Sequence, residues 1–237
     1  MIEIQSLNKT FHRTKALNEI SFTAPEGCSF ALLGPNGSGK TTLLKALIGS
    51  VLPDPGSRFT LDGHSDPQDP EYKRKFVYMP QLPGFPPHLS PRETIALLTR
   101  VRNQEAPRME RLLEELKIQE FWDKPFRELS GGMRQKINIL QCFMFDFQIA
   151  FLDEPTSSLD PRVALYLKNL IREIKSQGKT IMFTSHIMNE VEELADRMAL
   201  FSAGSIYLVT EPAAFVREKN AKNLEEALLY YWREHES

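Results

Sequence analysis

The nine residues Gly34–Thr42, GPNGSGKTT, constrain the fold of this chain more than any other stretch of its sequence. They follow the apolar run Ser29–Leu33 and precede leucines that recur at helical spacing, Leu43, Leu44 and Leu47. A G-x-x-x-x-G-K-[ST] sequence is a phosphate-binding loop when it joins a buried strand to an amphipathic helix. The motif alone leaves open an ordinary glycine-rich turn, but with the strand and helix in this order we expect nucleotide binding.

The residue types of this loop suit a phosphate ligand. Glycine permits backbone angles that a Cβ penalises, so successive N–H groups can point at one anion. The helix that follows begins with unpaired N–H groups at the positive end of its dipole. Lys40 supplies a positive charge for the outer phosphates, and the hydroxyl of Thr41 is suited to ligate Mg²⁺. The predicted nucleotide-binding residues of the loop are Gly34, Pro35, Asn36, Gly37, Ser38, Gly39, Lys40, Thr41 and Thr42.

Composition limits the class of protein that surrounds this loop. A chain of 237 residues, 41% of them hydrophobic, fits one α/β domain or one with a small insertion. The formal charge of −2 gives no reason to expect nucleic acid as a partner. Cys28 and Cys142 lie far apart in apolar settings, which indicates buried free thiols in a reducing compartment. Because signal-peptide and membrane-spanning patterns are missing, we expect a cytoplasmic protein that needs a separate chain for any membrane role.

Strand and helix patterns divide the chain into a core and an insertion. Alternating apolar residues predict strands at Ile2–Ile4 and Ile20–Phe22, ahead of the phosphate-loop strand. Between residues 82 and 148 the strand pattern is missing and helical spacing takes over. We therefore predict an α/β P-loop NTPase core, residues 1–81 and 149–237, with a mixed sheet and an N-terminal antiparallel β subdomain. Residues 82–148 would form an inserted helical subdomain, and the polar stretch His64–Glu71 a surface loop.

Two polar side chains are predicted at strand tips, where α/β sheets bind ligands. Gln81 follows the strand Phe76–Met79, and its amide could coordinate a metal or a water. His186 follows the strand Thr180–Thr184, where it could donate to a γ-phosphate oxygen. Taken singly, each residue fits a plainer interpretation as well, a loop glutamine and a structural histidine.

Two carboxylates end the apolar strand that begins at Ile149. Opposite a phosphate loop, Asp153 could hold Mg²⁺ through water. The adjacent Glu154 could accept the proton of an attacking water as a general base. Two solvated acids at a strand end are the alternative.

Three further positions are ambiguous from the residues alone. Ser130 can cap a helix that opens with Gly131 and Gly132, which makes either a second anion-binding helix start or an ordinary capped helix. Asp160 precedes a proline and is a good N-cap, a role that could explain it fully. Phe11 could stack on a nucleotide base or belong to the core.

Taken together, these motifs resemble the ATP-binding subunits of ABC transporters, and the resemblance covers nearly the whole chain. The matching stretches are GPNGSGKT for the phosphate loop, Gln81 for the Q-loop, LSGGM at Leu129–Met133 for the signature, FLDEP for the magnesium and base strand, SSLD for the D-loop, and Ser185-His186 for the switch histidine. Met133 departs from the glutamine that usually follows LSGG. The same helix carries Gln141-Cys142-Phe143 where small residues are common, which leaves its packing open.

The resemblance implies a role for each candidate. It makes Glu154 and His186 catalytic, and it assigns Mg²⁺ to Thr41, Gln81 and Asp153. Contacts to ATP are implied for Phe11, Gln81, Ser130, Gly131, Gly132 and Asp160. Two copies would close head to tail, with each ATP held between the phosphate loop of one and the signature of the other.

The resemblance also implies a transport role. A separate integral membrane permease would dock on Leu82–Leu89, which places the chain at the inner face of the cell membrane. The tail from Asn223 is weakly similar to export-type subunits, so we expect export rather than import. A non-transport ABC ATPase acting on nucleic acid or ribosomes is the main alternative, but the insertion is too short for a repair-type coiled coil. A P-loop kinase would have no use for His186 or LSGG.

Overall fold

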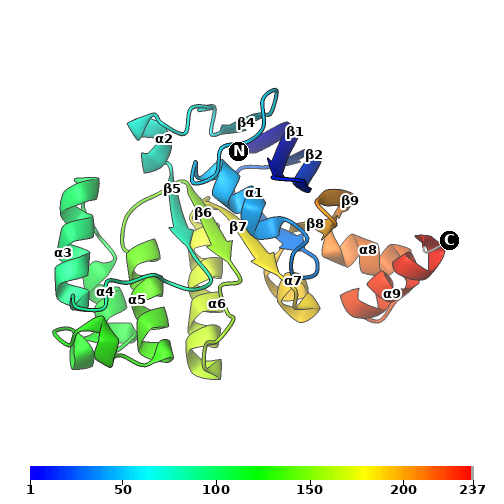
Figure 1. The fold of residues 1–237 in the computed structure, drawn as a ribbon. Coiled ribbons are helices and arrows are strands. Elements are labelled where there is room, and N and C mark those ends of the chain that lie inside the picture. The colour runs from blue at the N-terminus through cyan, green and yellow to red at the C-terminus, as the bar shows by residue number, and fades with distance from the viewer. Residues whose placement is uncertain (236–237) are drawn as a thin grey trace.

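A six-stranded mixed sheet forms the centre of the molecule, in the strand order β5-β6-β7-β3-β8-β9. Its strands are β3 (Ser29–Leu33), β5 (Phe76–Met79), β6 (Ile149–Asp153), β7 (Thr180–Ser185), β8 (Arg197–Ser202) and β9 (Ser205–Thr210). Five strands run parallel to one another, namely β3, β5, β6, β7 and β8, and β9 lies at one edge of the sheet, antiparallel to β8. The computed structural model, which describes residues 1–235, is drawn in Figure 1.

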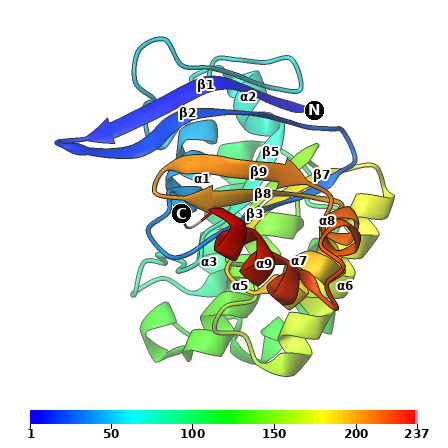
Figure 2. The same cartoon turned by 90° about the vertical axis from the view of Figure 1, so that its right-hand side faces the viewer.

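A smaller antiparallel sheet has the order β2-β1-β4. It consists of β1 (Ile2–Phe11), β2 (Thr14–Ala24) and β4 (Arg58–Leu61). Figure 2 shows the long β1–β2 hairpin lying beside β9. The predicted α/β core with an N-terminal antiparallel subdomain is therefore confirmed.

Side-chain alternation in the central strands feeds two apolar cores. In β3, Phe30 and Leu32 join one core with the small sheet and α1 (Lys40–Leu47), whereas Ala31 and Leu33 join the other. The second core contains α5 (Gly131–Phe143), α6 (Pro161–Ser176) and α7 (Met188–Leu194). Strands covered on both faces become apolar throughout. This is why β3, β6 and β7 are buried at every residue.

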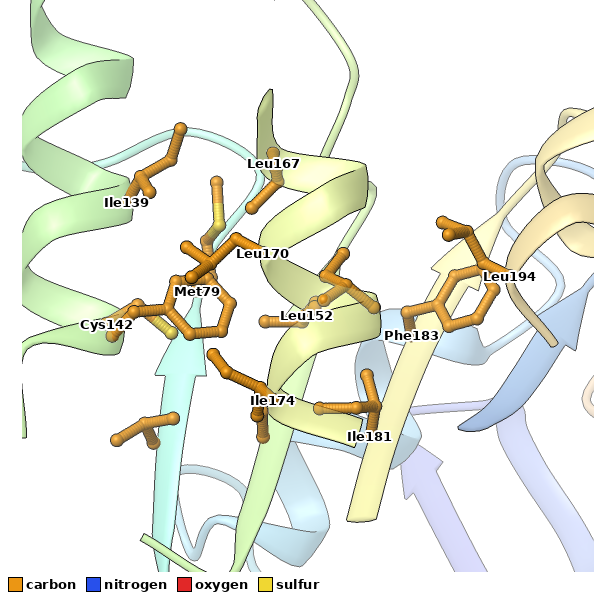
Figure 3. Packing of buried hydrophobic residues seen from close by; sticks show 14 of the residues in the cluster. Met79, Ile139, Cys142, Leu152, Leu167, Leu170, Ile174, Ile181, Phe183 and Leu194 are labelled. Atoms are coloured by element: carbon orange, nitrogen blue, oxygen red, sulfur yellow. The ribbon is translucent and has the colours of Figure 1, made fainter. Parts of the chain in front are cut away.

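The second core is seen from close by in Figure 3. Leu167, Leu170 and Ile174 of α6 lie over the strands that carry Leu152 and Ile181. Burying a leucine or isoleucine completely is worth about 1.5–3 kcal/mol. This packing fixes the ends of β6 and β7, and with them the polar residues that follow.

Residues 82–148 form helices, as predicted from the missing strand pattern. These are α3 (Pro91–Arg102), α4 (Met109–Glu115), two 3₁₀ turns (Ile118–Phe121 and Phe126–Glu128) and α5. Ser90 and Glu93 make the expected capping box at the start of α3. Apolar residues of this block share one core with the central sheet. The division into a helical subdomain and an α/β core therefore stays a prediction.

The expected loop at His64–Glu71 is wrong at its end, because α2 (Pro70–Arg74) begins within it. The Asp69 carboxylate caps α2 by accepting from the Glu71 N–H at 2.9 Å, and the buried Tyr72 anchors it. Five residues are too few to show helical periodicity. Two helices close the described chain, α8 (Pro212–Glu218) and the anticipated α9 (Leu224–His235). Within residues 1–235, no helix combines the length and apolar character needed to cross a bilayer.

Candidate functional site

The phosphate loop joins β3 to α1, and its geometry requires glycine at two positions. A Cβ on Gly34 would stand 2.2 Å from the Phe201 carbonyl oxygen, and one on Gly39 would stand 2.6 Å from that of Ala16. Gly39 also has a φ of +109° and directly precedes α1. The loop can therefore pack this closely against its surroundings while the N-terminus of α1 opens into it.

Lys40, the first residue of α1, folds back into the loop. Its ammonium group donates to the carbonyl oxygens of Gly34 at 2.7 Å and Pro35 at 2.8 Å. Burial lowers the pKa of Lys40, and the nearby Glu154 and Asp153 oppose that effect. Because both hydrogen-bond partners are neutral, the charge of Lys40 is available to an anion. A phosphate group fits this cradle.

Asp153 lies at the end of β6 and is almost fully buried. Its Oδ1 accepts from the Thr41 hydroxyl at 2.9 Å and from the Thr184 hydroxyl at 2.8 Å. Burial raises the pKa of Tyr78, and the negative charge of the nearby Asp153 adds to the shift. A hydroxyl and a carboxylate oxygen beside a phosphate cradle match the hard-oxygen ligands that Mg²⁺ prefers.

Glu154 is held from two sides. Its Oε2 accepts from the Gln81 amide at 2.8 Å, and its Oε1 lies 3.2 Å from Nδ1 of His186. The backbone φ of Glu154 is +46°, in the left-handed region that is unusual for a glutamate. Its N–H donates to the Thr184 hydroxyl at 2.8 Å, which supports this conformation. Strained residues of this kind cluster at functional sites.

The structure thus gathers the ends of β3, β5, β6 and β7 into one cluster. Lys40, Thr41, Asp153, Glu154, Gln81 and His186 meet there through hydrogen bonds or charge. Gln81 contacts Glu154 in this cluster, whereas Thr41 contacts Asp153. The assignment of Gln81 as a metal ligand stays a prediction.

Four residues that were predicted to contact ATP lie outside this cluster, namely Ser130, Gly131, Gly132 and Asp160. Ser130 is exposed, and its hydroxyl accepts from the Met133 N–H at 3.2 Å as the N-cap of α5. Apart from the adjoining backbone of α5 itself, a Cβ added to Gly131 or Gly132 would meet no atom of the described chain within 4 Å. Asp160 caps α6 through the N–H groups of Arg162 and Val163. Their contacts to ATP stay predictions.

Phe11 ends β1 with 43% of its surface exposed, so it is not a core residue. The ammonium group of Lys9 lies 5.1 Å from the centre of its ring. An exposed aromatic face is available to a flat ligand, and stacking on adenine stays a prediction.

Sequence reasoning missed the residues that brace the cluster from behind. Thr184 links the backbone of Glu154 to the carboxylate of Asp153. The only signal for Thr184 in the sequence is a hydroxyl inside an apolar strand. The amides of Gln135 and Asn138 reach the loop that carries Gln81, and their helical spacing gave no hint of that.

A phosphate loop, an acidic strand end and a polar residue at each neighbouring strand tip define a P-loop nucleotide hydrolase. Residues 17–157 match the family model described as ABC transporter. The chain is 33% identical over 223 residues to the Nod factor export ATP-binding protein I of Burkholderia lata, covering 92% of this chain and 73% of that one. To the protein of the same name from Bradyrhizobium diazoefficiens it is 30% identical over 221 residues, covering 92% and 72%.

Solved structures agree with these relatives. The ATP-binding subunit of an ABC transporter superposes with a TM-score of 0.88 at 25% identity, covering 97% of this chain and 98% of that one. A dimeric post-hydrolysis ATP-binding cassette bound to ADP and phosphate has a TM-score of 0.78 at 24% identity, covering 89% and 98%, and supports the fold alone. This chain belongs to the ABC transporter family, as the ATP-binding subunit that hydrolyses ATP to drive transport. The family resemblance predicted from the motifs is confirmed.

Proposed function

We propose that two copies of this chain close head to tail over two ATP molecules and power export through a separate membrane permease. The observation that carries the proposal is the position of Glu154. It stands one residue beyond the Asp153 carboxylate and between the side chains of Gln81 and His186. A carboxylate held this way is suited to orient a water and accept its proton.

In the proposed reaction, the γ-phosphate lies in the cradle formed by the phosphate loop and Lys40. Mg²⁺, held by Thr41 and Asp153, would supply charge neutralisation at the phosphates. The oxygen of a water held by Glu154 forms a bond to the γ-phosphorus, and the bond to the bridging oxygen breaks. The electron pair of that bond leaves with ADP, and the proton of the water passes to Glu154. His186 presents Nδ1 to Glu154, so its other ring nitrogen suits a γ-phosphate oxygen.

The second copy supplies what one chain lacks. Ser130, Gly131 and Gly132 are exposed and start α5 with open N–H groups, which suits an anion held from outside the chain. Open space around both glycines supports this assignment, since packing within the chain does not explain them. Closing this helix start on the γ-phosphate of the other copy would neutralise charge from both sides. Asp160 and Phe11 would complete the contacts around the nucleotide.

Export rests on the relatives, which are named as export ATP-binding proteins. The cargo in their names, the Nod factor, is a property of those relatives alone. The permease would dock on Leu82–Leu89, where Leu82 is 77% exposed directly after Gln81. The chain would then lie at the inner face of the cell membrane. Since the relatives are transport subunits, they favour this assignment over an ABC ATPase that acts on nucleic acid or ribosomes.

The experiment that tests the proposal is Glu154→Gln, which keeps the shape of the side chain but removes its basicity. We expect ATP binding to persist while steady-state phosphate release falls by about 10²–10⁴-fold, the usual cost of losing a general base. The matched control is Glu192→Gln, at an exposed position. Phosphate release by Glu154→Gln within a few-fold of the parent would reject Glu154 as the base.

A further inference from the structure

Three amide side chains follow one another along α5, at positions where the helix is packed against the protein. Asn138 is fully buried and Gln135 is 5% exposed. The Asn138 amide donates to Oε1 of Gln135 at 3.1 Å, and its Oδ1 accepts from the Gln141 amide at 2.9 Å. We call Gln135, Asn138 and Gln141 the amide chain. Burying a polar group is costly unless it forms hydrogen bonds, so the amide chain calls for an explanation beyond packing.

The amide chain reaches the loop that carries Gln81. Asn138 Nδ2 donates to the carbonyl oxygen of Pro80 at 2.8 Å, and Gln135 Nε2 donates to that of Gln81 at 2.9 Å. These two carbonyls belong to the peptide groups on either side of the Gln81 Cα. Holding both of them fixes the backbone of Gln81 and therefore the direction in which its side chain leaves.

The side chain of Gln81 reaches Glu154, the proposed base. The Gln81 amide donates to Oε2 of Glu154 at 2.8 Å, although Gln81 itself is exposed and follows the end of β5. An exposed loop glutamine loses side-chain entropy when it is held in one position. The two buried amides of α5, which packs against β5, provide the rigid support that this position needs.

We propose that Asn138 is a positioning residue for ATP hydrolysis, acting with Gln135 through the Pro80–Gln81 backbone to aim Gln81 at Glu154. The inference rests on the proposed role of Glu154 as the base. It assigns to this chain's own α5 a part in catalysis that is separate from the contact of its first residues with ATP. Asn138 touches neither nucleotide nor water in this scheme.

The test is Asn138→Leu, which replaces the amide with an apolar group of similar size. We expect kcat for ATP hydrolysis to fall about 10- to 100-fold, the range expected when a catalytic group is misplaced. KM and the ATP affinity from nucleotide titration should stay within about twofold, because the substitution removes no group that binds ATP. The control is Ile139→Val on the same helix, which removes a buried methylene but no amide and should leave kcat unchanged.

A double variant separates positioning from a general loss of stability. If Asn138 acts through Gln81, adding Asn138→Leu to Gln81→Ala should lower kcat no further than Gln81→Ala does alone. Two independent structural effects would multiply instead. Gln135→Met, which keeps the size of the side chain without its amide, should reproduce the selective loss of kcat. It decides the question if Asn138→Leu does not fold.

Two results would overturn the inference while the proposed base stands. These are a kcat within twofold of the parent in the folded Asn138 or Gln135 variant, and losses that multiply in the double variant. If Glu154→Gln retained the parent's turnover, the base and the inference would both fail. Since Glu154→Gln is measured separately, the two failures are distinguishable.

Discussion

The ammonium group of Lys40 is buried beneath the phosphate loop, where two backbone carbonyls accept its hydrogen bonds. Burial disfavours the charged form and lowers its pKa, while Glu154 and Asp153 nearby oppose that shift. A buried cation whose partners are neutral has lost the stabilisation that water gave its charge. An anionic ligand can make up for that loss. The same residue is therefore costly in the free protein and favourable in the complex with ATP.

Lys40→Ala should for this reason abolish ATP binding, measured by titration with a fluorescent nucleotide analogue. The substitution removes a charge-assisted hydrogen bond to phosphate, which is among the stronger kinds in proteins. Lys45→Ala is the matched control, because Lys45 lies exposed in the last turn of the same helix and should bind like the parent. An affinity for Lys40→Ala equal to that of the Lys45 variant would contradict the role of the cradle.

At this scale the sequence indicated candidate residues that lie in or beside a recognisable motif, such as Thr41, Asp153 and Glu154. It did not indicate Thr184 or Asn138, because the contacts of these side chains are with neighbours far away in the chain. Thr184 touches Asp153 only because β6 and β7 pair side by side. Asn138 reaches Pro80 only because α5 packs on β5. Single-residue chemistry does not contain that information.

At the scale of elements, two helices of the 82–148 block begin with a serine cap. Ser90 caps α3 within a capping box, and Ser130 caps α5 through the Met133 N–H. Only the second is followed by two glycines, and open space surrounds both of them. Replacing such a cap with alanine costs about 0.5–2 kcal/mol in either helix. The pair therefore separates the structural role of a cap from binding of the second copy's ATP.

Ser130→Ala should leave the ATP affinity of the single chain nearly unchanged while weakening ATP-dependent dimerisation. Ser90→Ala loses a cap of the same kind and should dimerise like the parent. Sedimentation velocity, in an Mg²⁺-free buffer that prevents turnover and over a range of concentrations, measures both. Equal dimerisation of the two variants would remove Ser130 from the interface.

Elements were predictable where they were long enough to carry a pattern. The glycine-rich turn before α1, the capping box of α3 and the Asp160 cap of α6 mark these helices, together with the spacing of their apolar residues. The apolar runs of β3 and β6 identify buried strands. The short α2 has no such periodicity, and its anchor Tyr72 donates to the Leu47 carbonyl oxygen, far back in the chain. Short helices of this kind form because of tertiary contacts, which local propensity does not describe.

For the whole molecule, the sequence indicated a mixed sheet but not its strand order. β3 lies between β7 and β8, although β4, β5 and β6 separate it from β7 in the chain. Long-range pairing of this kind depends on how the two apolar cores are shared among all strands. The order matters for function, because it brings the ends of β3, β5, β6 and β7 to the same edge of the sheet.

The whole molecule also carries the prediction on which the proposed function most depends. Each chain has one complete cluster around Glu154. It also has an exposed helix start at Ser130, and within the described chain no anionic group contacts this helix start. Glu154→Gln should bind ATP without splitting it, so the bridge between two copies should persist and dimers should accumulate. Sedimentation velocity with ATP and Mg²⁺ measures this, with ADP as the ligand control.

The double variant Glu154→Gln/Lys40→Ala keeps the same mutated base but cannot hold ATP, and it should stay monomeric under the same conditions. The γ-phosphate is the group that both copies are proposed to bind, so ADP should fail to form the dimer as well. If Glu154→Gln saturated with ATP sedimented as a single chain at every concentration, alone and in detergent with its permease, a shared nucleotide could not be the basis of its action. Transport would then have to be driven by changes within one chain, and the open glycines of α5 would need another ligand.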